Sequence, residues 1–325
     1  MNPRKFPALA VSTVLLGLGV AACGDDDETT SDGGGDTPTG LEGTIRIDGS
    51  STVAPLTEAV AEGFQQENSD VRVTVGTSGT GGGFEKFCAG ETDFSDASRE
   101  IEAEEEKLCA DGGVEYEEVQ VAVDALTVVV NPENPVTCIT TDQLADIWGP
   151  DTTATSWADI PDLDAEYDEE LVRYGPGTDS GTFDYFTEAI NGEEGVSTKD
   201  YNNVGEDDNA TVTGVTGDPG GIGYFGFSFF IENEGTIKAL EVDGGEGCVA
   251  PSVETAQDGS YAPLARPLFI YPRAEVFDDE TQTAFIDYYL ANVNSVAEGL
   301  GFIPLTDEQL TASEDAVASL ESESK

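Results

Sequence analysis

The segment TIRIDGSSTVAPLTEAVAEGFQQ, from Thr44 to Gln66, decides the fold. Its first residues alternate between apolar and polar side chains up to Gly49, which predicts a strand that ends at this glycine. Hydroxyl residues at 50–52 follow as candidate helix caps, and apolar residues then recur at intervals of four, which predicts a helix over 57–66. A strand, a turn rich in glycine and hydroxyl residues, and a helix together form the βα unit of an α/β sheet.

Two other segments share this design. SGTGGGF (78–84) follows a strand predicted over 71–75 and leads into a helix expected to begin near Gly83, and DSGTF (179–183) precedes a predicted helix over 183–190. In each segment, unpaired backbone N–H groups and side-chain hydroxyls gather at the positive end of a helix dipole, where anions bind. Three such turns that met at one point could replace the hydration shell of a small tetrahedral oxyanion.

The composition excludes several classes of function. The chain has 325 residues, of which 38% are hydrophobic, so it can bury a sizeable core and is expected to form two lobes. Lys and Arg number 13 against 66 Asp and Glu, a formal net charge of −53 that argues against a nucleic-acid partner. There is no histidine, so Ser180 has no histidine base, and no Ser-His-Asp triad, Cys-His pair or His-based zinc site can form.

The remaining pattern predicts how the two lobes are divided. An apolar strand over 119–130 can cross between the lobes, and a second strand over 264–271 can return. Between them, the pattern predicts a helix over 142–148 and a buried strand over 220–229. We therefore assign 41–130 and 265–325 to one lobe and 131–264 to the other.

The N-terminus predicts export. Arg4 and Lys5 precede a short apolar run that ends in Val-Ala-Ala-Cys, with Cys23 as the last residue. This ending resembles a bacterial lipobox, which implies that a signal peptide over 1–22 is removed and that Cys23 is acylated. The alternative is an ordinary signal peptide with an incidental cysteine. Residues 23–40, rich in Gly, Asp and Thr, are predicted to form a flexible tether.

Four cysteines remain after Cys23, and an even number in an exported protein predicts two disulfides. Three pairings are possible. The pairing of Cys88 with Cys109 and of Cys138 with Cys248 is the most economical, because each bond then falls within one predicted lobe. The competing hypothesis, a metal site, is disfavoured because no two of these cysteines are near neighbours in sequence.

Six motifs occur in this order: DGSSTVAPL, SGTGGGFEKF, DFSDASREI, GPGTDSGTFDYF, DPGGIGYFGF and LARPLFIY. Together they resemble the phosphate-binding lipoproteins of high-affinity phosphate ABC importers, and the resemblance runs from Thr44 to about Leu310. It implies the type 2 periplasmic-binding-protein fold, in which two α/β lobes joined by a two-strand hinge close on phosphate. It also implies that the phosphate is handed to a membrane permease.

The resemblance also implies a set of phosphate-binding groups. They are the side chains of Ser51 and Thr52 with the N–H of Val53 in the first turn, Thr80 in the second, and Ser180, Gly181 and Thr182 in the third. The alternative for each residue is that it only caps its own helix, since capping and anion binding use the same backbone groups.

The chain departs from the family pattern at two places. The family's arginine four residues before the third-turn serine is replaced by Pro176, so the pocket cation is predicted to be Arg99, with Arg173 as the alternative. The carboxylate that accepts the proton of hydrogen phosphate aligns with Ser98. Asp96 is the favoured substitute, and Asp179 beside the third turn is the other acidic candidate.

These observations lead to one principal hypothesis. The protein is a monomeric, non-enzymatic receptor for phosphate, without cofactor or metal, lipid-anchored on the outer side of the cytoplasmic membrane or in the periplasm. One alternative is a receptor for another oxyanion, such as sulfate or molybdate. The other is a phosphatase-like or signalling relative on the same fold.

Overall fold

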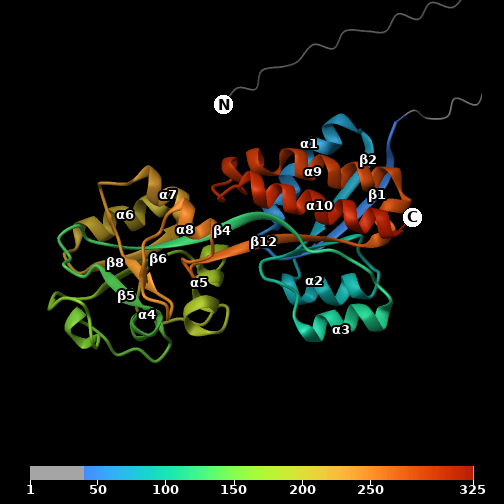
Figure 1. Cartoon of the computed structure of the whole chain (residues 1–325). Coiled ribbons are helices and arrows are strands. Elements are labelled where there is room, and N and C mark those ends of the chain that lie inside the picture. The colour runs from blue at the N-terminus through green and yellow to red at the C-terminus, as the bar shows by residue number, and fades with distance from the viewer. Residues whose placement is uncertain (1–39, 325) are drawn as a thin grey trace, which may run out of the picture. The chain divides into compact units, whose positions relative to one another are not determined.

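The computed structural model describes residues 40–324, which form two α/β lobes joined by two long strands (Figure 1). The connecting strands are β4 (Val119–Val130) and β12 (Ala265–Pro272), which pair with each other in antiparallel fashion. The predicted signal peptide, the lipidation site at Cys23 and all but the last residue of the tether lie outside the described residues. Within the described residues, no helix has the length and apolar character that crossing a bilayer requires.

Lobe 1 is built on strands in the order β2-β1-β3-β12-β4, where β1 runs parallel to both of its neighbours. Helices α1, α9 and α10 lie on one side of this sheet, and α2 and α3 lie on the other (Figure 1). The remaining bounds are β1 Glu42–Gly49, α1 Ala54–Glu67, β2 Asp70–Gly76, α2 Gly79–Cys88, β3 Phe94–Ala97, α3 Ala103–Gly112, the 3-10 helix η2 Ala274–Asp278, α9 Glu280–Gly299 and α10 Asp307–Ser324.

Lobe 2 continues from β4 in the order β4-β8-β6-β7, with β9 also pairing with β4, and has a small second sheet, β11-β10-β5. Strand β8 is antiparallel to β4 and parallel to β6. The bounds are β5 Cys138–Thr140, α4 Thr141–Trp148, η1 Trp157–Asp159, β6 Val172–Gly175, α5 Gly181–Asn191, β7 Asn202–Asn203, α6 Asp208–Gly217, β8 Gly221–Gly226, α7 Phe227–Glu232, β9 Lys238–Ala239, β10 Glu241–Asp243, β11 Cys248–Val249 and α8 Val253–Gln257.

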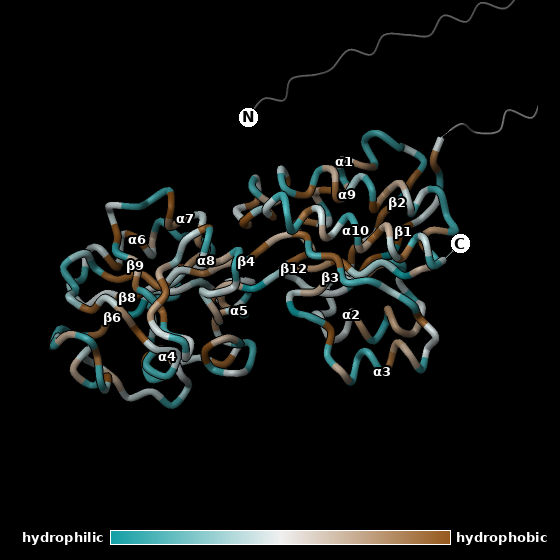
Figure 2. Tube along the Cα trace, in the orientation of Figure 1, coloured by the Kyte–Doolittle hydropathy of each residue, from teal (hydrophilic) through white to brown (hydrophobic). Residues whose placement is uncertain are grey.

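Each lobe has its own hydrophobic core, and β4 contributes to both. Val119 to Ala122 pack in the lobe 1 core, whereas Leu126, Val128 and Val130 pack in the main core of lobe 2. The apolar residues concentrate along these central strands, and the outer loops are hydrophilic (Figure 2). The change from one core to the other thus occurs inside β4, and the predicted boundary at residue 130 is the end of this strand.

The two predicted disulfides are confirmed. Cys88 is bonded to Cys109, which ties the end of α2 to α3 in lobe 1. Cys138 is bonded to Cys248, which ties β5 to β11 in lobe 2. Each of these two bonds therefore stabilises one lobe and does not link it to the other.

Two predicted boundaries were wrong. Helix α2 begins at Gly79, not near Gly83, so the glycine-rich segment is the first turn of the helix and not a loop before it. The predicted strand over 220–229 ends at Gly226, and its last residues begin α7. A short apolar run cannot be assigned to strand or helix by periodicity alone, because buried segments of both kinds are apolar all round.

Candidate functional site

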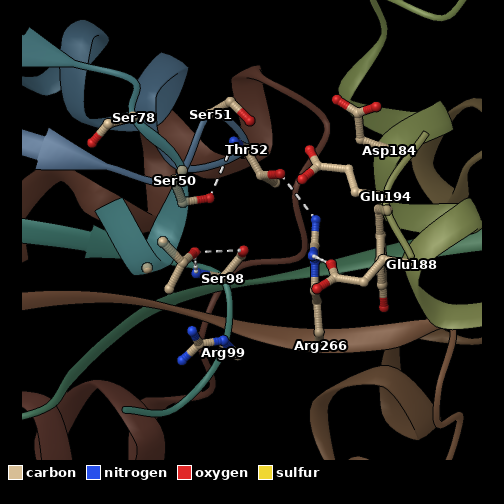
Figure 3. Close-up of a pocket in the computed structure, with 14 residues that line it drawn as sticks. Ser50, Ser51, Thr52, Ser78, Ser98, Arg99, Asp184, Glu188, Glu194 and Arg266 are labelled. Atoms are coloured by element: carbon tan, nitrogen blue, oxygen red, sulfur yellow. Dashed lines mark hydrogen bonds and ion pairs between the residues drawn. The ribbon is translucent and has the colours of Figure 1, made fainter. Parts of the chain in front are cut away.

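A cavity of about 310 Å³ lies between the lobes, and polar residues make up most of its wall (Figure 3). Lobe 1 supplies the ends of β1 and β3 and the start of α2, lobe 2 supplies α5 and the loop after it, and β12 supplies one arginine. The lining residues are Ser50, Ser51, Thr52, Ser78, Gly79, Thr80, Gly81, Ser98, Arg99, Asp184, Tyr185, Glu188, Glu194 and Arg266.

The first turn is positioned by a glycine at the end of β1. Gly49 has a φ of +147°, and a Cβ atom there would lie 2.0 Å from the backbone oxygen of Asp96, so only glycine fits between β1 and β3. The N–H of Ser50 donates to that same oxygen at 2.9 Å, and the N–H of Thr52 donates to the Ser50 Oγ at 3.2 Å. The turn from 50 to 52 is therefore fixed against β3 before any ligand arrives.

The start of α2 lies beside this turn because another glycine permits a close approach. A Cβ atom on Gly83 would lie 2.5 Å from the Cα of Gly49, which explains why position 83 is a glycine. Thr80, one turn earlier, places its Oγ1 3.1 Å from the Oγ of Ser98 and accepts the Ser98 N–H at 3.2 Å. The first N–H groups of a helix lack intrahelical acceptors, so the cavity wall at 79–81 offers donors to an anion.

A partly exposed ion pair holds the N-cap of α2 in place. Asp48 accepts hydrogen bonds from the Ser78 N–H at 3.1 Å and from its Oγ at 2.5 Å, and pairs with Lys86 at 2.5 Å. Burial alone would raise the pKa of Asp48, but the hydrogen bonds from Lys86 and Ser78 outweigh it and hold the pKa below its ordinary value. Asp48 thus stays ionised and anchors the second turn.

Arg266 of β12 is the cation that sequence reasoning missed. Its Nη2 donates to Thr52 Oγ1 at 2.9 Å, and its guanidinium lies 3.6 Å above the ring of Tyr185 in lobe 2. Asp124 and Glu188 each lie 3.5 Å from it, and its buried Nε has no acceptor among the described residues. The signal was present in the motif LARPLFIY, since an arginine on a strand that crosses between lobes must lie near their junction.

The two arginines predicted as pocket cations lie in different places. Arg99 lines the cavity as expected, but both of its Nη atoms are bonded to the Glu105 carboxylate at 2.8 Å. Arg173, the alternative, is not in the cavity wall. It is buried in lobe 2, where its guanidinium donates to the backbone oxygens of Ile147 and Ala154 at 2.7 Å. Arg173 therefore stabilises the lobe 2 core. The alternative prediction, that Arg173 is the pocket cation, does not agree with this structure.

The third predicted turn begins a helix as expected but does not line the cavity. Helix α5 starts at Gly181 with Ser180 as its N-cap, and Ser180, Gly181 and Thr182 lie outside the lining set. Lobe 2 instead presents three carboxylates, which we call the acidic wall: Asp184 and Glu188 from α5, and Glu194 from the loop after it (Figure 3). In this structure two of the three turns converge, and the third does not join them.

The comparisons with known proteins agree with this geometry. The model of the PBP superfamily domain matches residues 33–293. Protein SphX of Synechococcus elongatus is 48% identical over 82% of this chain and 79% of its own length. The phosphate-binding protein PstS of Staphylococcus epidermidis is 37% identical over 90% of this chain and 87% of its own length.

The chain belongs to the PstS-type branch of the PBP superfamily.

A solved structure supports the same assignment for the PstS-type fold. The crystal structure of a possible phosphate binding protein from Planctomyces limnophilus has a TM-score of 0.82 and 39% identity, and covers 86% of this chain and 99% of that one. The predicted α/β fold with two lobes and a two-strand hinge is thus confirmed.

In this PstS-type chain, Asp96 is not a cavity residue. Its side chain is fully buried on the α1 side of β3, where Oδ1 accepts from Thr57 Oγ1 at 2.9 Å and Oδ2 has no partner within residues 40–324. Burial raises the pKa of Asp96 to about 8, so the carboxyl group keeps its proton near neutral pH. Val53 is likewise fully buried, directly after the first turn. The structure therefore places Asp96 beneath the site and not in its wall.

The carboxylates of the acidic wall are the acidic groups that the cavity does contain. Burial, together with the neighbouring Glu194 carboxylate, raises the pKa of Asp184 to about 6. Asp184 lies in the motif GPGTDSGTFDYF, but the sequence did not distinguish it, Glu188 or Glu194 from the other carboxylates, because three among 66 acidic residues carry no signal. Only the tertiary structure shows that these three face the hydroxyl-rich wall of lobe 1.

Proposed function

We propose that this protein captures inorganic phosphate between its two lobes and delivers it to the permease of an ABC importer. The observation that carries the proposal is the meeting, in one cavity, of two helix-start turns rich in hydroxyls with the guanidinium of Arg266. The PstS relative named as a phosphate-binding protein supports phosphate as the ligand. Family membership supports a transport receptor, and we propose that the protein has no enzymatic activity.

Hydrogen bonds to an anion supply the affinity in this proposal. The donors are the side chains of Ser51, Thr52 and Thr80, the first N–H groups of α2, and the guanidinium of Arg266. Hydrogen bonds to charged groups contribute roughly 1.5–3 kcal/mol each. A handful of them offsets the ordering cost and gives a dissociation constant on the order of micromolar, which corresponds to about −8 kcal/mol.

Closure of the lobes is the step that would complete the site. Strands β4 and β12 connect the lobes, and both disulfides within residues 40–324 lie inside a single lobe, so bending at these strands can bring α5 toward lobe 1. We propose that Ser180, Gly181 and Thr182 then join the phosphate, together with the N–H of Val53. Arg99 and Ser98 remain members of the proposed site on the lobe 1 side.

Selectivity for phosphate over sulfate requires an acceptor for the ligand's proton, because sulfate is fully ionised and has none to donate. The buried position of Asp96 leaves the acidic wall as the source, and we propose Asp184 for this role. A carboxylate that faced sulfate would remain an unpaired charge in a desolvated site, so the discrimination is expected to be large.

The family and the N-terminal pattern support a proposal for the location of the protein. We propose that the mature chain is exported, lipid-anchored through Cys23, and monomeric, with residues 23–40 as the tether to the membrane. Metabolic labelling with a fatty acid should mark the wild-type chain and leave C23S unlabelled.

Titration calorimetry of the mature chain tests the function. We expect phosphate to bind at micromolar concentration or below and sulfate to release no comparable heat. Equal heats with the two anions would point instead to a general oxyanion receptor. Turnover of a phosphomonoester by the purified chain would point to a phosphatase-like relative.

A further inference from the structure

Arg266 is held by partners from both lobes at once. Thr52 in lobe 1 accepts from Nη2, and Glu188 of α5 lies against the guanidinium from lobe 2 (Figure 3). Tyr185, one turn before Glu188 on α5, places its ring 3.6 Å from the guanidinium carbon. The Tyr185 hydroxyl donates to the backbone oxygen of Pro263 at 2.9 Å, so the ring is a fixed platform. The guanidinium of Arg266 is therefore already paired with a carboxylate of the protein itself.

The two carboxylates on Arg266 differ in how firmly they are held. Asp124 is the register partner of Arg266 across the β4–β12 pair, and its side chain is 15% exposed. Glu188 lies on the surface of α5, its side chain is 55% exposed, and its contact with Nη1 is a single one at 3.5 Å. A half-exposed, single contact of this kind contributes little stability and can be given up, whereas the Asp124 pair is built into the sheet.

Arg99, in the wall of the same cavity, is held much more firmly by its carboxylate partner than Arg266 is by Glu188. Its guanidinium makes two hydrogen bonds of 2.8 Å to Glu105, a carboxylate that is only 15% exposed and that also accepts the Glu102 N–H at 2.9 Å. Bidentate pairs of this geometry are strong and well oriented. Of the two arginines in the wall, Arg266 is the one whose charge can be released to an incoming anion.

The charges around Arg266 favour an anion that replaces Glu188 over one that binds in addition to it. With Asp124 and Glu188 both beside it, Arg266 is already outnumbered by negative charge, and Asp184 and Glu194 lie on the same wall. An anion that added to this group would meet like charges a few ångströms away. An anion that replaced Glu188 would keep the charge balance and would also gain the buried Nε of Arg266, which has no acceptor among the described residues.

We propose that Glu188 is an internal competitor, which occupies Arg266 until phosphate displaces it and so sets the phosphate concentration at which the protein loads. This inference rests on the proposed phosphate-binding function. Glu188 would then weaken phosphate binding, although it lies in the binding cavity. Removal of its charge should strengthen binding.

The test compares E188Q with E193Q by calorimetry with inorganic phosphate at fixed pH and salt. Glu193 is exposed in the loop after α5 and forms no ion pair within residues 40–324, so its substitution makes the same change in net charge without touching Arg266. We expect E188Q to lower the dissociation constant for phosphate about two- to fivefold, the range of a partly exposed ion pair, and E193Q to leave it unchanged.

Each other result would overturn the proposal in a distinct way. Weaker phosphate binding together with stronger sulfate binding in E188Q would make Glu188 the proton acceptor. Weaker binding of both anions would make it a residue that positions Arg266. An effect equal to that of E193Q would reduce it to one surface charge among many. If the wild-type chain itself bound no phosphate, the proposed function would fail, and the E188Q comparison would not be needed to show it.

Discussion

The two walls of the cavity differ in the polar groups that they present. The lobe 1 wall consists of hydroxyls, helix N–H groups and Arg99, and in the described part of the chain no carboxylate of lobe 1 lines the cavity. The lobe 2 wall consists of Tyr185 and the three carboxylates of the acidic wall. Lobe 1 therefore presents hydrogen-bond donors to an anion, whereas lobe 2 presents carboxylates that can accept a hydrogen bond from a protonated one.

The walls also treat their acidic groups differently. Lobe 1 keeps Asp96 buried beneath the first turn with a pKa of about 8, and lobe 2 places Asp184 in the cavity with a pKa of about 6. Both groups hold a proton more readily than an ordinary aspartate. The first is expected to govern the stability of lobe 1, and the second the binding of the ligand.

The largest expected effect concerns Asp96. Its pKa in the folded state is about 8, whereas an ordinary aspartate has a pKa of 3.8, so between these values the folded chain holds a proton that the unfolded chain has released. The free energy of unfolding should therefore fall as pH rises through this window, with a slope of up to about 1.4 kcal/mol per pH unit relative to D96N. Urea titrations of both proteins from pH 5 to pH 8 measure this difference.

E193Q serves as the control for this experiment, because it removes one exposed carboxylate and should follow the wild-type pH dependence. A constant difference between the wild type and D96N at every pH would show that Asp96 is ionised in the folded protein. Asp96 would then be available again as a ligand residue.

The next effect concerns the cation between the two walls. We expect R266Q to weaken phosphate binding by about ten- to a hundredfold, since a charge-assisted hydrogen bond contributes roughly 1.5–3 kcal/mol. R72Q is a matched control, because Arg72 is exposed on β2 and has no ion pair in the described residues. Calorimetry that gave R266Q and R72Q the same affinity would return Arg99 to the role of pocket cation.

The smallest expected effect concerns single hydroxyl groups, one in the lobe 1 wall that is already formed and one in lobe 2 that would reach the ligand only after closure. T80V removes a hydroxyl that already lines the cavity, and S180A removes one that reaches the ligand only if the lobes close. We expect each to weaken phosphate binding about fivefold, the value of one ordinary hydrogen bond. Wild-type affinity in S180A would show that the Ser180 hydroxyl does not reach the phosphate.

The elements that the sequence predicted best are those with a strong local signal. The strand over 44–49, the helix after it and the β4 crossing were all found, because alternation, capping residues and long apolar runs are local properties. The start of α2 was misplaced because glycine normally disfavours a helix. The glycine at position 83 is explained by a tertiary contact, because a Cβ atom there would lie 2.5 Å from the Cα of Gly49, 34 residues earlier in the chain.

By itself, the sequence determined the class of the protein. Three hydroxyl-rich helix starts, six motifs in order, four paired cysteines and the absence of histidine were enough for the α/β fold, the disulfides and an oxyanion site. Only the tertiary structure decided which charges meet in that site. In the folded chain Arg266 lines the cavity, whereas Arg173 and Asp96 are buried in the lobes. The carboxylates of the acidic wall lie opposite lobe 1. The physical reason is that hydrogen bonding at a helix start is fixed by residues next to one another, whereas the burial and pairing of a charge depend on strands and helices from distant parts of the chain.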